Sequence, residues 1–321
     1  MKAVTRMAVA SVLVLALAAC DMGGGDDDAF PTGPVTIVVP YGPGGDTDIG
    51  ARLTAQYLEE ELDESVVVSN VEGAGGTVGS QEVMQADPDG HTLLYNHHNH
   101  ILNPLLGISD VTYEDFEIVG AIVSDYTIMA AVHGDSEFAD INELIEYADT
   151  NPGEVTAGVG YGNTSHFFAL GLEAATGVEF NIVDVGGGAD QQNALLGERV
   201  DFIWGEWARM EDSIEAGDFR SLGIALEDRA ELLPDEPTMI EQGVDYIAYP
   251  KDFFLFAPPE TPDDVIDALS GALESLADNT EYQDALAEQY MNASFLSPED
   301  TLATIEEAEA EYSVLAEQFV D

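Results

Sequence analysis

Four times in this chain, a short run rich in apolar and β-branched residues leads into a glycine-rich turn and then into a segment with helical periodicity. The runs cover residues 35–39, 66–68, 154–159 and 180–185, and the turns after them start at Gly42, Gly73, Gly160 and Gly186. Alternating strands and helices predict parallel sheets covered by helices, because parallel strands must be joined by a crossover connection. The four units form two similar pairs, one on each side of residue 130, so we expect an α/β protein with two lobes.

Each glycine-rich turn stands where a helix begins, and this position favours anions. The first turn of a helix leaves backbone N–H groups unpaired and carries about half a positive charge. Glycines before it allow positive φ angles and close approach of a ligand, so such a turn can bind an anion without a basic side chain. Glycines between a strand and a helix can also serve close packing alone. Four such turns in paired positions favour the binding interpretation for the set.

The turns do not match the phosphate-binding motifs of nucleotide-binding proteins. None has the Gly-x-x-x-x-Gly-Lys-Ser/Thr sequence of a P-loop. After Gly73-x-Gly75, a dinucleotide fingerprint requires a glycine at the position of Val78, and the next glycine is Gly79. We therefore expect a small anion rather than a nucleotide in the crevice at the carboxyl ends of the strands.

The charge balance narrows the function further. The 321 residues include 8 Lys+Arg and 63 Asp+Glu, a formal net charge of −55. Nucleic acids and anionic lipid surfaces are disfavoured as partners, because both attract proteins through basic residues. A hydrophobic content of 45% can build a core, so disorder is disfavoured as well. Because high salt screens repulsion between surface charges, we interpret the composition as that of a halophilic, haloarchaeal-type protein; an acidic protein of a mesophile is the alternative.

The first 33 residues resemble an export signal followed by an anchor. Lys2 and Arg6 precede an apolar stretch that is too short for a membrane span, and small residues precede Cys20, the one cysteine in the sequence. We predict a signal peptide over residues 1–19, lipidation of Cys20 and a flexible tether over residues 20–33. The protein would then be extracytoplasmic, lipid-anchored to the outer face of the cell membrane. A buried free cysteine in a helical anchor is the alternative.

From about residue 34 onward, a series of motifs resembles one known family. These motifs are VVPYGPGGDTD at 38–48, NVEGAGGTVG at 70–79, DPDGHTLL at 87–94, HILNP at 100–104, NPG at 151–153 and LPDEPT at 233–238. Their order and spacing are similar to those of the extracytoplasmic receptors of tripartite tricarboxylate transporters, also called Bug or TctC receptors. The chain departs from the family pattern at Gly42, at residues 184–187, and where Lys251 and Asp252 stand near a usual Trp-x-Gly segment.

The resemblance implies a type II periplasmic-binding-protein fold, with a mixed or parallel sheet in each lobe and two crossover strands. It also implies a small carboxylate ligand, held largely by main-chain groups and ordered water and delivered to two permease subunits in the membrane. From the apolar runs at 127–132 and 253–257, we place lobe one at residues 34–129 plus 252–321 and lobe two at residues 130–251. Closure of the lobes by hinge bending would bury the ligand.

The candidate ligand-binding residues come from the four turns and from nearby strand ends. At the first two turns they are Tyr41, Gly44, Gly45, Thr47, Asp48, Gly75, Gly76 and Thr77. At the last two turns they are Thr164, Ser165, His166, Gly187, Gly188, Ala189 and Asp190, to which we add Trp207, His98 and His100. Backbone N–H groups of the glycines would donate to a carboxylate, whereas Asp48 and Asp190 could instead cap helices. Arg199 and Arg209 could pair with the ligand or with nearby acidic residues.

Two other functions remain open from the sequence. His97, His98 and His100 offer three imidazoles for a transition metal, which would make the chain a secreted metal-binding lipoprotein. Ser165 and His166 could serve a hydrolase, but no Gly-x-Ser-x-Gly nucleophile elbow surrounds the serine. We favour a non-enzymatic, monomeric receptor without a cofactor or metal, which binds a di- or tricarboxylate or a related organic acid.

Overall fold

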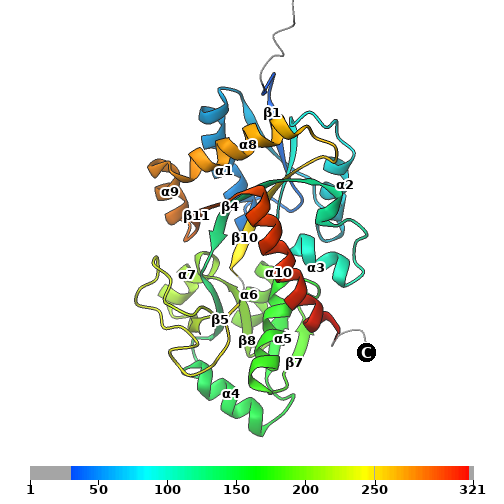
Figure 1. Ribbon diagram of the computed structural model, residues 1–321. Helices are drawn as coiled ribbons and strands as arrows, with labels where there is room; N and C mark the ends of the chain where they lie inside the picture. Colours follow the sequence, from blue (N-terminus) through cyan, green and yellow to red (C-terminus); the bar gives the residue numbers. More distant parts are fainter. Residues whose placement is uncertain (1–29, 249, 318–321) are drawn as a thin grey trace, which may run out of the picture.

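The computed structural model describes residues 30–248 and 250–317. The predicted signal peptide and Cys20 lie outside the described residues. Within them, two lobes lie one above the other, each built around its own sheet (Figure 1). No helix in the described ranges is long and apolar enough to cross a bilayer.

Lobe one contains a six-stranded mixed sheet. Its strands are β1 (Val35–Val39), β2 (Val66–Asn70), β3 (Thr92–His97), β4 (Glu117–Asp125), β10 (Lys251–Ala257) and β11 (Asn292–Leu296), in the spatial order β11-β4-β10-β3-β1-β2. Strand β1 runs parallel to β2 and β3, whereas β10 is antiparallel to both β3 and β4. The carboxyl ends of β1, β2 and β3 therefore share one edge of the sheet.

Lobe two contains a five-stranded mixed sheet. Its strands are β5 (Ile128–His133), β6 (Thr156–Val159), β7 (Asn181–Asp184), β8 (Phe202–Glu206) and β9 (Phe219–Ile224), in the spatial order β7-β6-β8-β5-β9. Strand β6 is parallel to β7 and β8, and β5 is antiparallel to its neighbours β8 and β9. The carboxyl ends of β6, β7 and β8 share an edge, as in lobe one.

Both sheets are apolar on both faces, which explains why their strands read as continuous hydrophobic runs. In β1, Val35, Ile37 and Val39 enter one core cluster while Val38 enters the cluster on the opposite face. In β5, Ala130 and Met129 divide in the same way between two clusters. Side chains alternate across a strand, so a sheet with helices on both faces needs apolar residues at every position.

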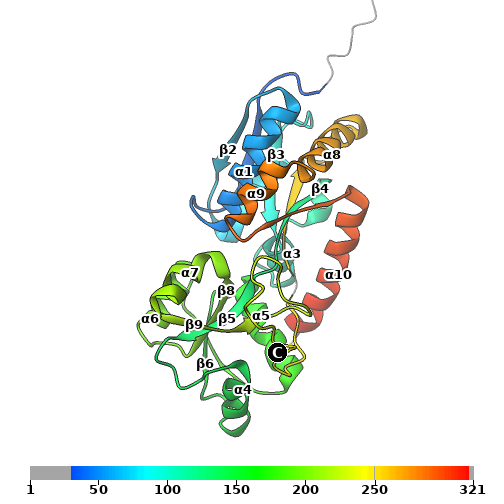
Figure 2. The same ribbon diagram turned by 90° about the vertical axis from the view of Figure 1, so that its left-hand side faces the viewer.

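The helices cover these faces and connect the strands. In lobe one they are α1 (Asp46–Leu62), α2 (Thr77–Met84), α3 (Asn99–Leu105), α8 (Asp263–Ala277) and α9 (Thr280–Ala287). In lobe two they are α4 (Ile141–Thr150), α5 (Thr164–Thr176), α6 (Gly188–Leu196) and α7 (Trp207–Ala216). Two short 3-10 helices, Ala74–Gly76 and Tyr113–Asp115, lie in lobe one. Figure 2 shows α1 and α9 on one side of the upper sheet and α6 and α7 above the lower one.

The chain passes between the lobes twice at the level of the sheets. It leaves β4 at Asp125 and enters β5 at Ile128, and it returns into β10 at Lys251. Strand β5 thus begins two residues before the lobe boundary that we placed at residue 130. The linkers at 126–127 and near 250 are short, which suits a hinge.

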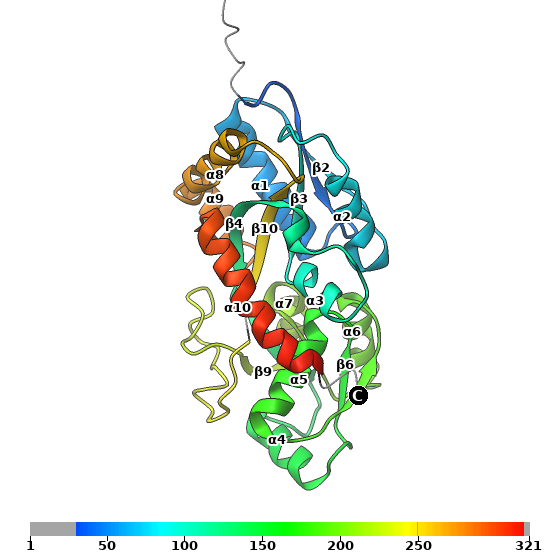
Figure 3. The same ribbon diagram turned by 45° about the vertical axis from the view of Figure 1, so that its right-hand side comes forward.

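The last helix, α10 (Pro298–Ala316), makes a further link between the lobes. It contacts β4 and α3 in lobe one and α5 in lobe two, and Figures 1 and 3 show it running from one lobe to the other. The ring of Tyr312 lies 5.4 Å from that of Phe167 in α5 and 5.9 Å from that of His98. We expected the C-terminal helices to pack on lobe one; α8 and α9 do so through α1, whereas α10 spans both lobes.

The strand-turn-helix units of the sequence are present, with small shifts at their ends. Helix α5 begins at Thr164 and α6 at Gly188, several residues earlier than the periodicity of their apolar residues indicates. The residues of these first turns are polar or small, so they carry no apolar period, and helix ends are the least certain part of such a prediction. The third and fourth turns are accordingly shorter than expected, and their last residues are helical.

Candidate ligand-binding cleft

A cavity of about 320 Å³ lies between the two lobes. Lobe one lines it with residues that follow β1, β2 and β3, among them Tyr41, Gly75 and Asn99. Lobe two lines it with residues that follow β6, such as Ser165, and with the end of β8, such as Glu206. The two sheet edges at which parallel strands end thus face each other, which is where open α/β sheets bind ligands.

Helices α1, α5 and α6 are among those that start at this cavity. Helix α1 has Gly45 as its N-cap, α5 has Asn163 and α6 has Gly187, and none of these residues makes a side-chain capping bond. Gly45, Asn163 and the first residue of α6, Gly188, all line the cavity. Each helix start adds about half a positive charge and unpaired N–H groups to the wall, so the cavity attracts anionic oxygen atoms.

The first turn is held together by Asp48. Its carboxylate accepts hydrogen bonds from the N–H of Gly44 (2.9 Å), from Arg52 Nε (2.9 Å) and from Asn70 Nδ2 (2.8 Å). Burial raises the pKa of Asp48, but the bonds from Arg52, Gly44 and Asn70 outweigh burial and lower it below its usual value. Asp48 and the Gly44 amide therefore shape the turn, and neither lines the cavity.

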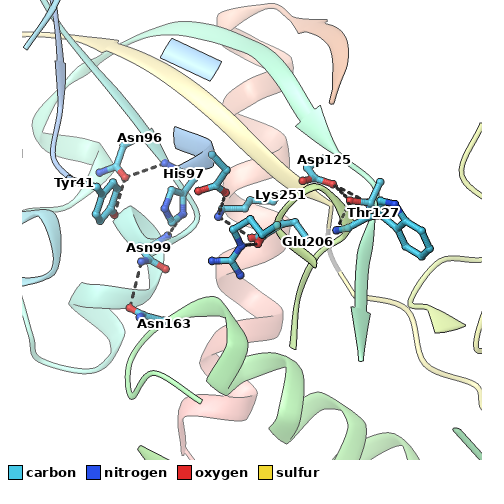
Figure 4. A network of polar contacts seen from close by, with 12 residues as sticks. Tyr41, Asn96, His97, Asn99, Asp125, Thr127, Asn163, Glu206 and Lys251 are labelled. Atoms are coloured by element: carbon cyan, nitrogen blue, oxygen red, sulfur yellow. Dashed lines mark hydrogen bonds and ion pairs between the residues drawn. The ribbon is translucent and has the colours of Figure 1, made fainter. Parts of the chain in front are cut away.

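The second turn supports the aromatic wall of the cavity. The N–H of Gly76 donates to the carbonyl of Gly73 (3.0 Å), so this amide closes the loop. Gly76 has φ +100°, and a Cβ atom there would lie 3.1 Å from the hydroxyl oxygen of Tyr41. Tyr41 fills this space, donates to Asn96 Oδ1 (3.0 Å) and stacks on His97 with ring centroids 5.0 Å apart. Figure 4 shows this group beside Asn99.

The third and fourth turns are joined by Gln191 of α6. Its Nε2 donates to Ser165 Oγ (3.2 Å) and to the carbonyl of Gly186 (3.0 Å). The same Ser165 hydroxyl accepts from the N–H of Gly160 (3.1 Å). The lobes also touch directly, because Asn99 Nδ2 in lobe one donates to Asn163 Oδ1 in lobe two (3.4 Å; Figure 4). Ser165 Oγ thus accepts two hydrogen bonds that tie the third turn to the fourth, and neither comes from a side chain that could act as a general base.

An ionic cluster crosses the cavity floor; we use this name for Asp46, Glu206, Arg209 and Lys251. Lys251 Nζ donates to Asp46 in lobe one and to Glu206 Oε1 in lobe two, the second at 2.9 Å (Figure 4). Arg209 Nε lies 2.6 Å from Glu206 Oε2. Burial alone would lower the pKa of Lys251, but Asp46 and Glu206 raise it above its ordinary value. The four groups are therefore charged at neutral pH, and their formal charges cancel.

Two glycines make room for the guanidinium of Arg209. A Cβ atom at Gly188 would lie 1.7 Å from Arg209 Nη1, and one at Gly205 would lie 2.8 Å from Nη2. The guanidinium therefore sits against the backbone at the start of α6. A cation at a helix N-terminus is unfavourable by itself, so an anion that contacts both the helix start and Arg209 would stabilise both.

Asp125 lies beside this cluster at the first crossing between the lobes. Its Oδ1 accepts from the N–H (2.7 Å) and hydroxyl (2.6 Å) of Thr127, while its buried Oδ2 has no partner among residues 30–248 and 250–317. Burial and the neighbouring charge of Glu206 raise the pKa of Asp125 to about 7. A protonated Oδ2 is consistent with this environment.

Replacing Asp125 by asparagine is expected to stabilise the protein relative to the wild type as the pH rises. A raised pKa means that the folded state holds the proton more tightly, so wild-type stability falls from about pH 4 to about pH 7. A difference of one unit between the folded and unfolded pKa values corresponds to about 1.4 kcal/mol. We therefore expect the free energy of unfolding of the variant, relative to that of the wild type, to grow by more than ~1 kcal/mol between pH 5 and pH 8. Urea unfolding at both pH values, with the exposed Asp87→Asn as control, measures it; a constant gap would contradict the assignment.

The structure brings part of the predicted site together. Lining the cavity are Tyr41, Gly45, Thr47, Gly75, Thr164, Ser165 and Gly188. Outside its lining lie Gly44, Asp48, Gly76, Thr77, His98, His100, His166, Gly187, Ala189, Asp190 and Trp207. Several of the latter build the turns behind the wall, as Asp48 and Gly76 do. Asp190 lies in the first turn of α6, where Gly187 and not Asp190 is the N-cap.

The histidines point to different surroundings. Strand β3 ends at His97, which lines the cavity, whereas α3 starts at Asn99 and turns the next imidazoles away. The ring of His98 packs against Phe254 and Tyr312, and that of His100 against Phe116 and Phe256. Burial lowers the pKa of His98 to about 3 and that of His100 to about 4. Nowhere in the described part of the chain do three side chains of metal-ligating type come together, so the metal-binding alternative has no site there.

The two tryptophans also differ in position. Trp204 of β8 lines the cavity and is fully buried against Phe168 and Tyr246. Trp207, at the first position of α7, points instead toward Tyr290, with ring centroids 6.4 Å apart. Trp207, which we chose for the ligand site, thus lies outside the cavity lining, to which Trp204 contributes. Strand β8 continues to Glu206, and only its side chains that alternate toward the cleft reach the cavity.

Sequence reasoning missed much of the polar lining. The missed residues include Asp46, Asn99, Asn163, Gln191, Glu206 and Lys251. Arg209, which we named as a partner of either the ligand or an acidic residue, lines the cavity and pairs with Glu206. One signal was available for Lys251, which is one of only two lysines and stands where the chain departs from the family pattern. A basic residue is rare in this chain, so its presence beside an apolar strand indicates a specific partner. Glu206 and Asp46 carry no such signal, because they are two among 63 acidic residues.

Comparison with known proteins supports the assignment of the fold. A family model described as "Tripartite tricarboxylate transporter family receptor" (TctC) matches residues 50–319. A protein of Pseudomonas sp. strain P51, described as "UPF0065 protein in tcbD-tcbE intergenic region", is 31% identical over 291 residues, 88% of this chain and 85% of its own length. The structure of an R. palustris protein with adipate is 27% identical, with a TM-score of 0.81, and covers 90% of this chain and 97% of that one.

A structure of the periplasmic binding protein BugD is 29% identical, with a TM-score of 0.76, and covers 90% of this chain and 98% of its own. These similarities confirm the predicted two-lobed periplasmic-binding-protein fold with a mixed sheet in each lobe. The family model extends over both lobes and includes every lining residue with a number above 49. The chain belongs to the tripartite tricarboxylate transporter receptor (TctC) family.

Proposed function

We propose that this chain is an extracytoplasmic solute-binding receptor, not an enzyme, which captures a small carboxylate between its lobes. The observation that carries the proposal is the cavity at which α1, α5 and α6 begin and which Arg209 also lines. Helix starts and a guanidinium are donors that fit carboxylate oxygen atoms. The related R. palustris protein was solved with adipate, a carboxylate.

Ligand binding would act by stabilising the closed arrangement of the lobes. Two links join them at the cavity: Asn99 donates to Asn163, and Lys251, at the second crossing, connects Asp46 of lobe one with Glu206 of lobe two. A ligand that contacts both walls binds only the closed form well, so it shifts the equilibrium toward that form. We propose the lobes 34–129 plus 252–321 and 130–251 as the moving units, with the short crossings near residues 126 and 250 as hinges. Helix α10 would limit the amplitude, because it packs on both units.

Titration calorimetry in 3 M KCl tests the carboxylate proposal. The panel should contain mono-, di- and tricarboxylates and zinc chloride, with intrinsic fluorescence as a second readout because Trp204 lines the cavity. We expect saturable binding of at least one carboxylate and none of zinc. Binding of zinc without binding of any carboxylate would overturn the proposal. Mass spectrometry of ligand released from the denatured purified protein identifies the natural solute.

The proposed partners rest on the family, and the proposed membrane anchor rests on the sequence. We propose delivery of the ligand to the membrane permease of a tripartite tricarboxylate transporter by a monomeric receptor that is tethered through lipidated Cys20. The tether and cysteine lie outside the described residues, so this part of the proposal rests on the sequence. Mass spectrometry of the mature N-terminus checks it, since lipidation predicts a chain that starts at a modified Cys20.

We also propose that the protein is adapted to high salt. A formal net charge of −55 on 321 residues repels the compact state at low ionic strength, and molar salt shortens the Debye length to about 3 Å. Relief of several kcal/mol of repulsion corresponds to roughly 10 °C in Tm for a protein of this size class. We therefore expect Tm to rise by at least ~10 °C between 0.1 M and 3 M KCl, measured by circular dichroism. A constant or falling Tm would mark an ordinary acidic protein.

A further inference from the structure

One side chain of lobe one reaches across to lobe two. Tyr290 lies between α9 and β11, and its hydroxyl group donates a hydrogen bond to Glu211 Oε1 on α7. We propose that Tyr290 is a positioning residue that latches the two lobes: its bond to Glu211 stabilises the closed form and so increases the affinity for a bound solute. This inference deepens the proposed function and rests on closure of the lobes around a ligand.

Tyr290 belongs to lobe one by its place in the chain and to lobe two by its packing. Asn292, two residues later, pairs with Ser124 in the lobe-one sheet. The ring of Tyr290, however, packs against a core cluster whose other described members all come from lobe two. Its centroid lies 6.4 Å from that of Trp207 at the start of α7. A single side chain thus joins the core of one lobe to the backbone of the other.

The elements that meet at this contact are those that form the cavity wall. The next residue, Met291, approaches α1, because a Cβ atom at Gly50 would lie 3.8 Å from Met291 Sδ. Helix α1 begins at the cavity, and α7 contributes the lining residue Arg209, two positions before Glu211. Figure 1 shows β11 above α7. A rotation that separates the cavity walls would therefore draw α7 away from Tyr290 and break the bond.

The backbone at Tyr290 has a conformation that is unfavourable for a tyrosine. The N–H groups of Met291 and Tyr290 donate to the carbonyls of Leu286 and Ala287, both at 3.0 Å, which is the Schellman ending of a helix. Tyr290 occupies the left-handed position of this motif with φ +56°, where glycine is usual because it has no Cβ atom. Helices α5 and α7 each end with a glycine in this conformation. No other aromatic residue in the described part of the chain has a positive φ.

The turn by itself would therefore favour glycine, so the side chain of Tyr290 accounts for its presence. Its bond to Glu211 raises the pKa of the hydroxyl group above its ordinary value, which keeps the donor protonated. Hydrogen bonds to a charged acceptor are among the strong ones in proteins. A bond that exists only in the closed form stabilises that form alone, and the apparent affinity for a ligand rises with the closed fraction.

Replacing Tyr290 by phenylalanine removes the hydroxyl group and keeps the ring and the backbone conformation. We expect the ratio of closed to open molecules to fall at least about fivefold, because one net hydrogen bond corresponds to a factor of this size. Tyr113→Phe is the matched control. The hydroxyl group of Tyr113 donates to Glu309 Oε2 (2.9 Å), so the same pair of groups is broken, but within lobe one. This control should leave the ratio unchanged.

The distance between two spin labels measures this ratio without any ligand. Val67→Cys on β2 and Leu196→Cys at the end of α6 place the labels on exposed positions of the two lobes, and Cys20→Ser leaves these as the reactive thiols. Strand β2 is the edge strand on the far side of β1 and β3 from the crossings, so its label moves widely. Pulsed electron paramagnetic resonance in 3 M KCl then gives the closed and open populations.

Affinity provides the second readout. Calorimetry with adipate, succinate and citrate should show weaker binding to Tyr290→Phe than to Tyr113→Phe, by a similar factor for each of these acids that binds. The factor is shared because the latch acts on closure and does not select the ligand. A substrate contact would instead change the order of the affinities.

Variants of the acceptor assign the effect to the bond. Glu211→Gln keeps an acceptor at Oε1 and should retain most of the closed population, whereas Glu211→Ala should behave as Tyr290→Phe does. Adding Tyr290→Phe to Glu211→Ala should then cause little further change, because the bond is already lost. Full and additive effects of both substitutions would show that they act separately and would overturn the latch.

The outcomes separate this inference from the proposed function. Equal closed populations and equal affinities of Tyr290→Phe and Tyr113→Phe would overturn the latch and leave the receptor proposal standing. A larger closed population in Tyr290→Phe would overturn it as well. If the labels report the expected shift while none of the carboxylates binds to the wild type, the latch stands and the carboxylate receptor fails.

Discussion

Replacing Lys251 by methionine is expected to lower the free energy of unfolding by about 3–5 kcal/mol, the usual effect of breaking a buried ion pair on one side. Lys251 is buried and donates to both Asp46 and Glu206. Without it, Asp46 is left without its cation in the cavity floor, and Glu206 keeps only Arg209. Methionine preserves most of the side-chain volume, so the loss reports charge rather than packing. Urea unfolding in 3 M KCl gives the value.

Two further variants make the result specific. Arg229→Met breaks an exposed ion pair with Glu241 (2.8 Å) and is expected to change stability by less than ~1 kcal/mol. Adding Asp46→Asn to Lys251→Met leaves the balanced pair of Glu206 with Arg209, and should restore more than half of the loss. A Lys251→Met variant no less stable than Arg229→Met would show that the ionic cluster does not hold the two lobes as described.

Replacing Gly188 by alanine is expected to weaken carboxylate binding by about 10- to 150-fold. A Cβ atom at this position would lie 1.7 Å from Arg209 Nη1, so the guanidinium must leave the start of α6. The side chain is flexible and moves without disturbing the backbone. The ligand then loses charge-assisted hydrogen bonds, each of which contributes about 1.5–3 kcal/mol. Calorimetry with the best ligand of the panel, together with Tm, separates affinity from stability.

The neighbouring glycine provides the control for this substitution. Gly187 has φ −70°, and no atom lies within 4 Å of a Cβ built on it. Gly187→Ala should therefore bind ligand as the wild type does, although it adds the same methyl group one residue earlier. If both variants bind the ligand as tightly as the wild type, Arg209 takes no part in binding. Equal and large losses would point to the backbone of the turn instead.

The fold could be predicted because its signals are local. Strands such as β1, with five residues from Val35 to Val39, are apolar at nearly every position since helices cover both faces of the sheet. Glycines at the ends of β1, β2, β6 and β7 mark the turns, and the two pairs of units mark the two lobes. The position of α10 across both lobes could not be predicted in this way. Its amphipathic pattern shows that one face is buried, but not which lobe buries it.

The candidate site could be predicted only in its backbone. Gly45, Gly75 and Gly188 line the cavity because a helix or loop start after a parallel strand lies at the carboxyl edge of the sheet. The histidines mark the limit, since their chemistry suggested a site while the end of β3 at His97 sends His98 and His100 into the core. Periodicity does not reveal where a strand ends to within one residue, and one residue changes the direction of a side chain.

The sequence by itself determined the two α/β lobes, the position of the cleft and the membership of the family, because apolar periodicity and turn glycines act over a few residues. Only the tertiary structure decided the chemistry of the cleft. Lys251 meets Asp46 across 205 positions and Glu206 across 45 positions of the chain. Nothing local tells which of 63 acidic residues will be buried beside a lysine, since an ion pair depends on distance in space and on exclusion of water.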